Sequence, residues 1–287
     1  MKKNIKFWIL FGLTILLSLG SQLLAQANRI LTIAPTAQAS SIGNVMLPMM
    51  NPARNLYNKD KFSFSRVNWM TNIVNDMSYN FIDFDRGPFG VNVMFFNYGE
   101  QNQADEYGII QGQFTPLSAV YGFNYARKID KYNLGFDTKI ITHNLHTQTA
   151  TGFIFSAGGY FPKVYKDLDV DVMIQNFGLA PKFGGYKSEL PTSLNISMTY
   201  PYKEWMFYEQ YNIFKKFHTW GGGVAYNYKD MLWGKLGYYL DNTHKLNYPT
   251  FGLDFKYDKY LIGMSYIYGD ETLPLSNTIR LTINLEL

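Results

Sequence analysis

The side chains of this sequence with the most potential for chemistry are four histidines and a pair of aspartates, because the chain contains no cysteine. His143 and His146 are three residues apart near the end of a predicted strand. Successive side chains of a strand point to opposite faces, so these two histidines are not expected to bind one metal ion. His218 lies beside lysines and His244 lies in a predicted turn, as interfacial and loop residues do. We expect no metal site.

Asp169 and Asp171 share one face of a predicted strand, about 7 Å apart after two strand rises. Paired carboxylates can divide the roles of general acid and general base, although in a barrel they also occur in a wet lumen or rim. An outer-membrane hydrolase would need an inward-facing histidine oriented by a serine or aspartate. No phosphate-binding loop, dinucleotide fingerprint or nucleophilic-serine motif is found. We expect a non-enzyme without a cofactor.

The composition narrows the class of protein. The 287 residues include 22 Phe, 23 Tyr and 5 Trp, with 47% hydrophobic and 17% charged residues, which excludes a disordered chain. The absence of cysteine excludes a disulfide scaffold and Cys-ligated zinc or iron–sulfur sites. A net charge of +4 is too small to predict the concentrated basic face that nucleic-acid binding needs.

Residues 1–25 have the layout of a secretory signal peptide. A basic stretch, residues 1–6, precedes the apolar residues 7–19, and small residues end at Ala25. The alternative is a transmembrane anchor, but the apolar run is shorter than the roughly 20 residues that a spanning helix needs. No cysteine stands at the predicted cleavage point, so we expect no lipid anchor.

Beyond residue 60, apolar and polar side chains alternate as they do in half-buried strands. In residues 279–287, for example, apolar side chains occupy the odd positions and polar ones the even positions. A closed barrel usually has an even number of strands, so one of the fifteen candidates is expected to be misassigned, leaving about 14. The candidates lie near 61–68, 76–84, 88–97, 106–114, 117–127, 132–142, 151–161, 168–175, 192–200, 204–212, 217–228, 230–240, 249–257, 259–268 and 277–286.

Two architectures fit so many amphipathic strands, a soluble β-sandwich and an outer-membrane barrel. Many candidates are close to the roughly 9–11 residues that cross a bilayer at a tilt. Aromatic residues lie toward strand ends, and the polar face carries Gly, Ser, Asn and charges that cannot pack an apolar core. We therefore predict an all-β, transmembrane antiparallel barrel over residues 61–287, in lipid contact in the outer membrane of a Gram-negative bacterium.

Residues 26–60 are rich in Ala, Ser, Met and Pro and lack the period of two. Because they precede the first strand, we predict a plug or hatch in the lumen. The alternative is a partly ordered periplasmic leader.

Asn51, Pro52 and Ala53, after the small-residue run 40–43, resemble the N-terminal signature of the PorV/PorQ family of type IX secretion outer-membrane proteins, which are related in fold to FadL fatty-acid transporters. Residues 95–114, 117–141, 172–183 and 189–192 resemble further turns and strand edges of that family, in the same order, and 95–125 is closer to the PorQ type. The resemblance implies a FadL-like barrel of 14 strands. It also implies a scaffold or shuttle for secreted cargo or surface partners of type IX secretion.

Two predicted loops, 176–191 and 269–276, are candidates for partner binding. Phe177, Phe183 and Tyr186 in the first are aromatic anchors suited to protein contact, and a solvated loop without a partner is the alternative.

The competing function is a FadL-type transporter of hydrophobic small molecules. Met46, Leu47, Met49 and Met50 would line its apolar pocket, since Met adapts to such sites. Alternatively these residues pack the plug against the barrel wall.

Overall fold

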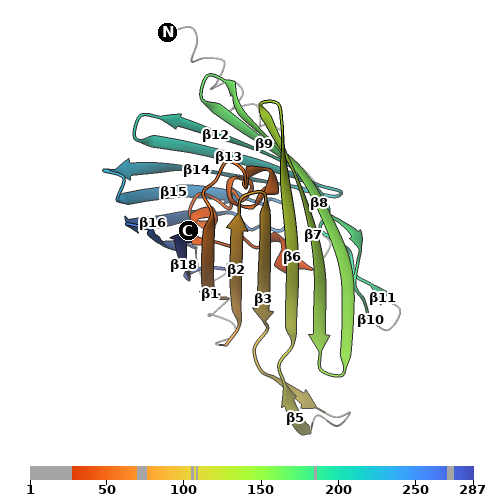
Figure 1. Cartoon of the computed structure of the whole chain (residues 1–287). Coiled ribbons are helices and arrows are strands. Elements are labelled where there is room, and N and C mark those ends of the chain that lie inside the picture. The colour runs from red at the N-terminus through yellow and green to blue at the C-terminus, as the bar shows by residue number, and fades with distance from the viewer. Residues whose placement is uncertain (1–27, 70–75, 105–106, 108, 184–185, 270–274) are drawn as a thin grey trace.

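Fourteen antiparallel strands close into one barrel in the computed structural model (Figure 1). The structure describes residues 28–69, 76–104, 107, 109–183, 186–269 and 275–287, so the predicted signal peptide lies outside the described residues. The ring closes because β1 pairs with β18. The barrel strands are β1 (Lys61–Asn68), β2 (Ser78–Arg86), β3 (Phe89–Asn97), β6 (Leu117–Ile129), β7 (Tyr132–Leu145), β8 (Gln148–Tyr165), β9 (Leu168–Leu179), β12 (Ser193–Tyr202), β13 (Trp205–Phe214), β14 (His218–Tyr228), β15 (Leu232–Leu240), β16 (Tyr248–Tyr257), β17 (Tyr260–Ile267) and β18 (Thr278–Glu286).

The candidate strand near 106–114 was wrongly placed in the barrel wall. Within this range the structure has β5 (Ile110–Phe114), which pairs with β4 (Gln101–Ala104) in a separate hairpin. This hairpin projects beyond the ring (Figure 1), and most of its residues are exposed on both faces. Alternation predicted the strand correctly, but it carries no information on which strand is the partner. A second small hairpin, β10 (Lys182–Phe183) with β11 (Tyr186–Lys187), lies in the connection from β9 to β12.

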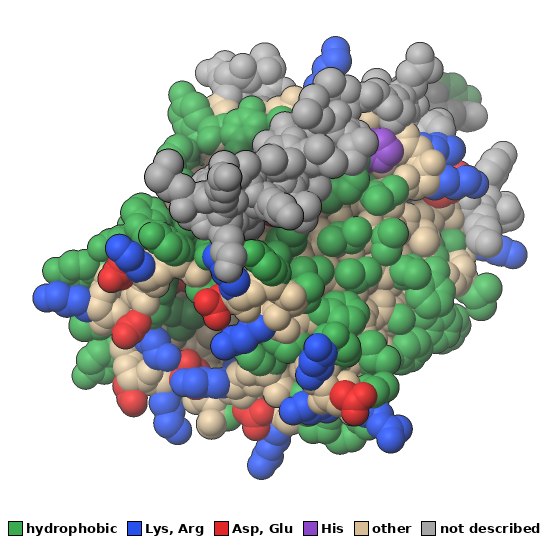
Figure 2. Space-filling model, turned by 90° about the horizontal axis from the view of Figure 1, so that it is seen from above, with side chains coloured by type: hydrophobic (Ala, Val, Ile, Leu, Met, Phe, Trp, Pro, Cys, Tyr) green, Lys and Arg blue, Asp and Glu red, His purple; other side chains and the backbone are tan. Residues whose placement is uncertain are grey.

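The outer face of the wall is apolar and the inner face is largely polar. In β1, Phe62 and Phe64 point outward and are 39% and 38% exposed, whereas Ser63 and Ser65 between them are buried. Figure 2 shows hydrophobic side chains over the flank of the barrel, with charged side chains gathered around the rim. A soluble sandwich would have the opposite pattern, so the outer face fits contact with lipid hydrocarbon and the barrel prediction is confirmed.

The two ends of the barrel differ in their connections. At one end, here the short-turn end, strands are joined by turns of two or three residues. Several of these turns contain left-handed residues, as tight hairpins favour. At the other end, the long-loop end, most connections are longer, as expected for the extracellular side of such barrels. The longest of these connections are 69–77, 98–116, 180–192, 241–247 and 268–277.

Residues 28–58, here the luminal segment, cross the inside of the ring (Figure 1). They form the 3₁₀ helices η1 (Arg29–Thr32) and η2 (Pro52–Arg54) and the helices α2 (Ala37–Ser40) and α3 (Leu47–Met50). Helix α2 contacts β16 to β18, α3 contacts β9 and β12, and η2 contacts β6 to β8, so the segment touches opposite walls. No helix among the described residues is long and apolar enough to span a membrane.

The backbone of the luminal segment lies directly against the strands where glycines line the wall. Gly43 has a left-handed φ of 75°. A Cβ atom on Gly221 of β14 or on Gly237 of β15 would overlap the Gly43 backbone. The run of glycines in β14 therefore provides a flat surface on which this part of the segment rests.

Candidate binding site

A cavity of about 310 Å³ lies inside the barrel between the luminal segment and the wall. Its volume is within the range of small-ligand sites. Several lining residues, among them Trp69, Met77 and Leu275, belong to connections at the long-loop end, which places the cavity in that half of the lumen. Its most prominent lining side chains are aromatic: Trp69, Phe96, Tyr98, Phe217, Tyr239 and Tyr248.

The inner face changes from polar to apolar along β1, β2 and β3. In β2, the inward-facing residues from the short-turn end are Asp85 and Asp83, followed by Phe81 and Tyr79, and all four are buried. The neighbouring strands change in the same way, from serine to Val67 in β1 and from asparagine to Met94 and Phe96 in β3. This apolar patch packs against Ile30 and Ile33 of the luminal segment.

The rings of the cavity make edge and tilted contacts that hold them in place. Trp69 lies edge-on to Phe96 with ring centroids 6.2 Å apart, and Phe96 lies 4.6 Å from Tyr98. These contacts leave an apolar space bounded by ring faces and edges, suited to a small hydrophobic molecule.

Several polar side chains also line the cavity, among them Arg280 and His244. The guanidinium of Arg280 lies 5.9 Å from the ring of Trp69 and 5.5 Å from that of Tyr79, and it donates to the Ala34 carbonyl oxygen. The Nδ1 atom of His244 lies 2.7 Å from a carboxylate oxygen of Asp241.

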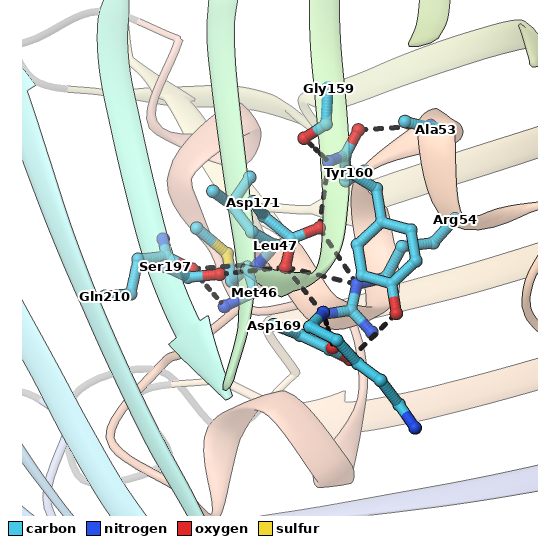
Figure 3. Close-up of polar contacts among 12 residues, drawn as sticks. Met46, Leu47, Ala53, Arg54, Gly159, Tyr160, Asp169, Asp171, Ser197 and Gln210 are labelled. Atoms are coloured by element: carbon cyan, nitrogen blue, oxygen red, sulfur yellow. Dashed lines mark hydrogen bonds and ion pairs between the residues drawn. The ribbon is translucent and has the colours of Figure 1, made fainter. Parts of the chain in front are cut away.

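Asp169 and Asp171 are occupied by separate structural contacts and do not form an acid–base pair. Asp171 is fully buried and accepts hydrogen bonds from Arg54, from Asn51 and from Ser197 (Figure 3). Asp169 accepts from the Tyr160 hydroxyl at 2.8 Å. Burial opposes the charge of Arg54, but the hydrogen bond and charge of Asp171 outweigh it and raise the pKa of Arg54.

Polar side chains of the wall bind the backbone of the luminal segment. The side-chain oxygen of Gln210 accepts from the amides of Met46 and Leu47, both at 2.8 Å (Figure 3). Thr282 accepts from the Ala37 amide at 2.7 Å. These contacts satisfy backbone groups that would otherwise be buried without partners, and they fix the position of the segment.

Met46, Leu47, Met49 and Met50 are not among the lining residues of this cavity. Leu47 is fully buried in α3, which packs against the wall, as the alternative interpretation expected. The luminal segment contributes η1 and the residues after it to the cavity instead.

Asn51, Pro52 and Ala53 are buried where the luminal segment meets β7 and β8. The Asn51 side chain caps η2 by accepting from the Ala53 amide and donates to the Gly159 carbonyl oxygen at 3.0 Å. The motif therefore has a structural role in this chain.

The predicted partner-binding residues lie in three different settings. Phe177 is in β9 and packs on the outer face with its ring centroid 6.1 Å from that of Phe155, so its assignment to a loop was wrong. Phe183 lies in β10 with its ring 6.0 Å from that of His143. Tyr186 belongs to β11, and its side chain is outside the described residues. Most of the second predicted loop, 269–276, also lies outside them.

His143 and His146 lie in different environments. His143 is inward-facing and lies 2.6 Å from the Asn28 side-chain oxygen, whereas His146 is exposed in a turn beside Phe114. Within the described ranges, no three His, Asp or Glu side chains gather in a way that could hold a metal ion.

No protein-family model and no curated protein matches this chain. Solved structures share the fold at low sequence identity. A deltaS2 mutant of the TodX monoaromatic hydrocarbon channel has a TM-score of 0.57 and 12% identity, covering 87% of this chain and 96% of that chain. The toluene transporter TbuX of Ralstonia pickettii has a TM-score of 0.54 and 11% identity, with 90% and 97% covered. The CymD monoaromatic hydrocarbon channel has a TM-score of 0.54 and 10% identity, with the same coverage.

These likenesses show the fold, which is a FadL-like barrel as the sequence predicted.

Proposed function

We propose that this protein is an outer-membrane channel for small hydrophobic molecules, the function that the sequence left as its alternative. The observation that carries the proposal is the ring-lined cavity of about 310 Å³ inside the barrel. The names of the structural neighbours, toluene transporter and monoaromatic hydrocarbon channel, support the same class of cargo. In this proposal the protein transports its ligand without catalysing a reaction.

The two ends of the lumen differ, and this difference suits passage of a ligand from the long-loop end to the short-turn end. A ligand enters among the loops of the long-loop end, which faces outward, and reaches the cavity first. The luminal segment below it acts as a plug, so passage to the short-turn end requires this segment to shift. There the inner face carries ion pairs such as Lys61 with Asp83 and Asp85, which hold a hydrophobic molecule weakly and favour its release.

Binding of propylbenzene to the purified protein tests the proposal. Ile33 lines the cavity, so Ile33→Trp fills it and lowers the affinity about tenfold or more. The matched control is Ile283→Trp, because Ile283 is 46% exposed on the outer face of β18 and that variant leaves binding unchanged. Wild-type protein that binds no hydrocarbon, or equal binding by both variants, would refute the proposal.

A role in type IX secretion remains a prediction from the motif resemblance, and the comparisons support the transport function better. Crosslinking in outer membranes followed by pull-down tests it. Recovery of translocon or cargo proteins would favour secretion, whereas a deletion strain with an uptake defect and normal secretion would exclude it.

A further inference from the structure

Arg280 is a buried cation without a carboxylate partner among the described residues. The residue is only 2% exposed and projects from β18 into the wall of the cavity. Taking an ionised group out of water is strongly unfavourable unless an opposite charge and hydrogen bonds compensate it. The described carboxylates therefore do not account for the stability of this buried positive charge.

The other buried cations of the described residues show how this barrel normally compensates such a charge. Arg54 pairs with Asp171, Lys139 with Asp137, and Lys235 with Asp254. Each of these pairs lies outside the cavity lining, and each acid is itself buried. Arg280 is the exception among them, and it is also the one that lines the cavity.

The contacts of Arg280 hold the guanidinium in place without neutralising it. Its faces lie over the rings of Trp69 and Tyr79, and one terminal nitrogen donates to the Ala34 carbonyl oxygen. Its Nε atom is buried without a hydrogen-bond partner. Aromatic faces and one carbonyl oxygen stabilise a cation but leave a donor of the guanidinium unused.

The remaining charges on the lining do not cancel this one. Arg29 adds a second positive charge. Asp241, the one carboxylate among the described lining residues, is paired with His244 at 2.7 Å. The Nε2 atom of His244 is buried without a partner and supplies a second unused polar group on the lining. The site thus combines an apolar, ring-lined body with unpaired polar groups.

We propose that the cavity takes a small organic acid with an aromatic or short apolar body, whose carboxylate binds Arg280. The ring-lined space receives the apolar part, and the carboxylate supplies the charge that the protein lacks. A charge-assisted hydrogen bond of this kind is about twice as strong as a neutral one. This inference rests on the proposed transport function, because it names the cargo of the same cavity.

Equilibrium dialysis of the purified wild-type protein against labelled 3-phenylpropionate and labelled propylbenzene tests the inference. The two ligands share a phenyl ring and a three-carbon chain and differ in the carboxylate. The wild-type protein binds the acid about tenfold more tightly than the hydrocarbon, given the usual strength of hydrogen bonds to charged groups. Arg280→Met removes this preference, while Arg280→Lys keeps part of it.

The control variant is Arg66→Met, since Arg66 is an exposed arginine of β1 that is not part of the cavity lining, and this variant retains the preference. Wild-type protein that binds propylbenzene at least as tightly as 3-phenylpropionate overturns the inference and leaves the proposed function standing. Wild-type protein that binds neither ligand overturns both. The comparison within the wild-type protein is decisive even if Arg280→Met fails to fold.

Discussion

Arg54 and Asp171 are 117 residues apart in the chain and meet inside the barrel as a two-point ion pair. The Nη2 atom of Arg54 lies 2.7 Å from Oδ2 of Asp171, and its Nε atom lies 2.9 Å from Oδ1. The pair joins the luminal segment to β9, and both side chains are almost completely excluded from solvent. The position of the luminal segment therefore depends on this buried ion pair as well as on the hydrogen bonds that wall side chains make to its backbone.

Arg54→Met is expected to destabilise the folded protein by about 3–5 kcal/mol, because it leaves the Asp171 carboxylate buried without its cation. The measurement is chemical unfolding of the protein in vesicles, together with protease cleavage within the luminal segment. The matched control is Lys59→Met, which breaks an ion pair with Glu286 in which the lysine side chain is 71% exposed. That change costs about 1 kcal/mol or less. Equal effects of both variants would show that Arg54 does not anchor the segment.

Gly221→Val is expected to displace the luminal segment while the ring of strands still closes. A side chain at this position of β14 meets the backbone of Gly43, and a backbone cannot move aside as a flexible side chain can. Single-channel recordings should show a larger conductance, and heat-modifiable migration should remain. Gly234→Val in β15 is the control, because a Cβ there meets open space. A conductance that stays at the wild-type value in Gly221→Val would show that the luminal segment does not rest against β14 at this position.

Phe123→Arg tests contact of the outer face with lipid. Phe123 is 46% exposed on β6, well inside the strand. An arginine near the middle of the hydrocarbon layer costs about 2–4 kcal/mol, and this falls to about 0–1 kcal/mol near the interface. Tyr257→Arg at the short-turn end of β16 is therefore the matched control. The folding equilibrium in vesicles measures both, and a harmless Phe123→Arg would contradict a lipid-facing wall.

Alternation of side chains was sufficient to predict most of the wall, because one face of each strand meets lipid and the other meets the lumen. It predicted residues 61–68 with the bounds that β1 has. It failed at 106–114, where Ile110, Gly112 and Phe114 alternate with glutamines but pair with β4 instead of the wall. The period of a strand fixes its faces, whereas its partner depends on contacts across the chain.

The cavity was less accessible to sequence reasoning, although one signal was present. The inward row of β2 changes from Asp83 and Asp85 to Phe81 and Tyr79, which shows that the lumen does not have one polarity along its length. Placing Arg280 on the polar face was also possible from the alternation. Its lack of a carboxylate partner depends on how β18 meets the luminal segment and the neighbouring strands, and no local pattern contains that information.

Asn28 links three parts of the long-loop end, so Asn28→Ala is expected to loosen the connection 180–192. Its side-chain nitrogen, Nδ2, lies 2.7 Å from the Glu189 carbonyl oxygen and 3.2 Å from the Ser188 hydroxyl. Its side-chain oxygen, Oδ1, lies 2.6 Å from Nε2 of His143. Its φ of 70° is left-handed, a conformation that Asn tolerates better than Ala. Limited proteolysis should therefore cleave this connection faster in the variant.

Asn28→Asp separates the two causes, since it tolerates the left-handed backbone and keeps an acceptor for His143 but loses the donor to Ser188 and Glu189. If the donor ties down the connection, Asn28→Asp is cleaved nearly as fast as Asn28→Ala. Cleavage of Asn28→Asp at the wild-type rate would instead assign the effect to the backbone conformation. Unchanged cleavage in Asn28→Ala would show that the connection is held by its other contacts, such as the hydrogen bond from Thr192 to the Asn176 carbonyl oxygen.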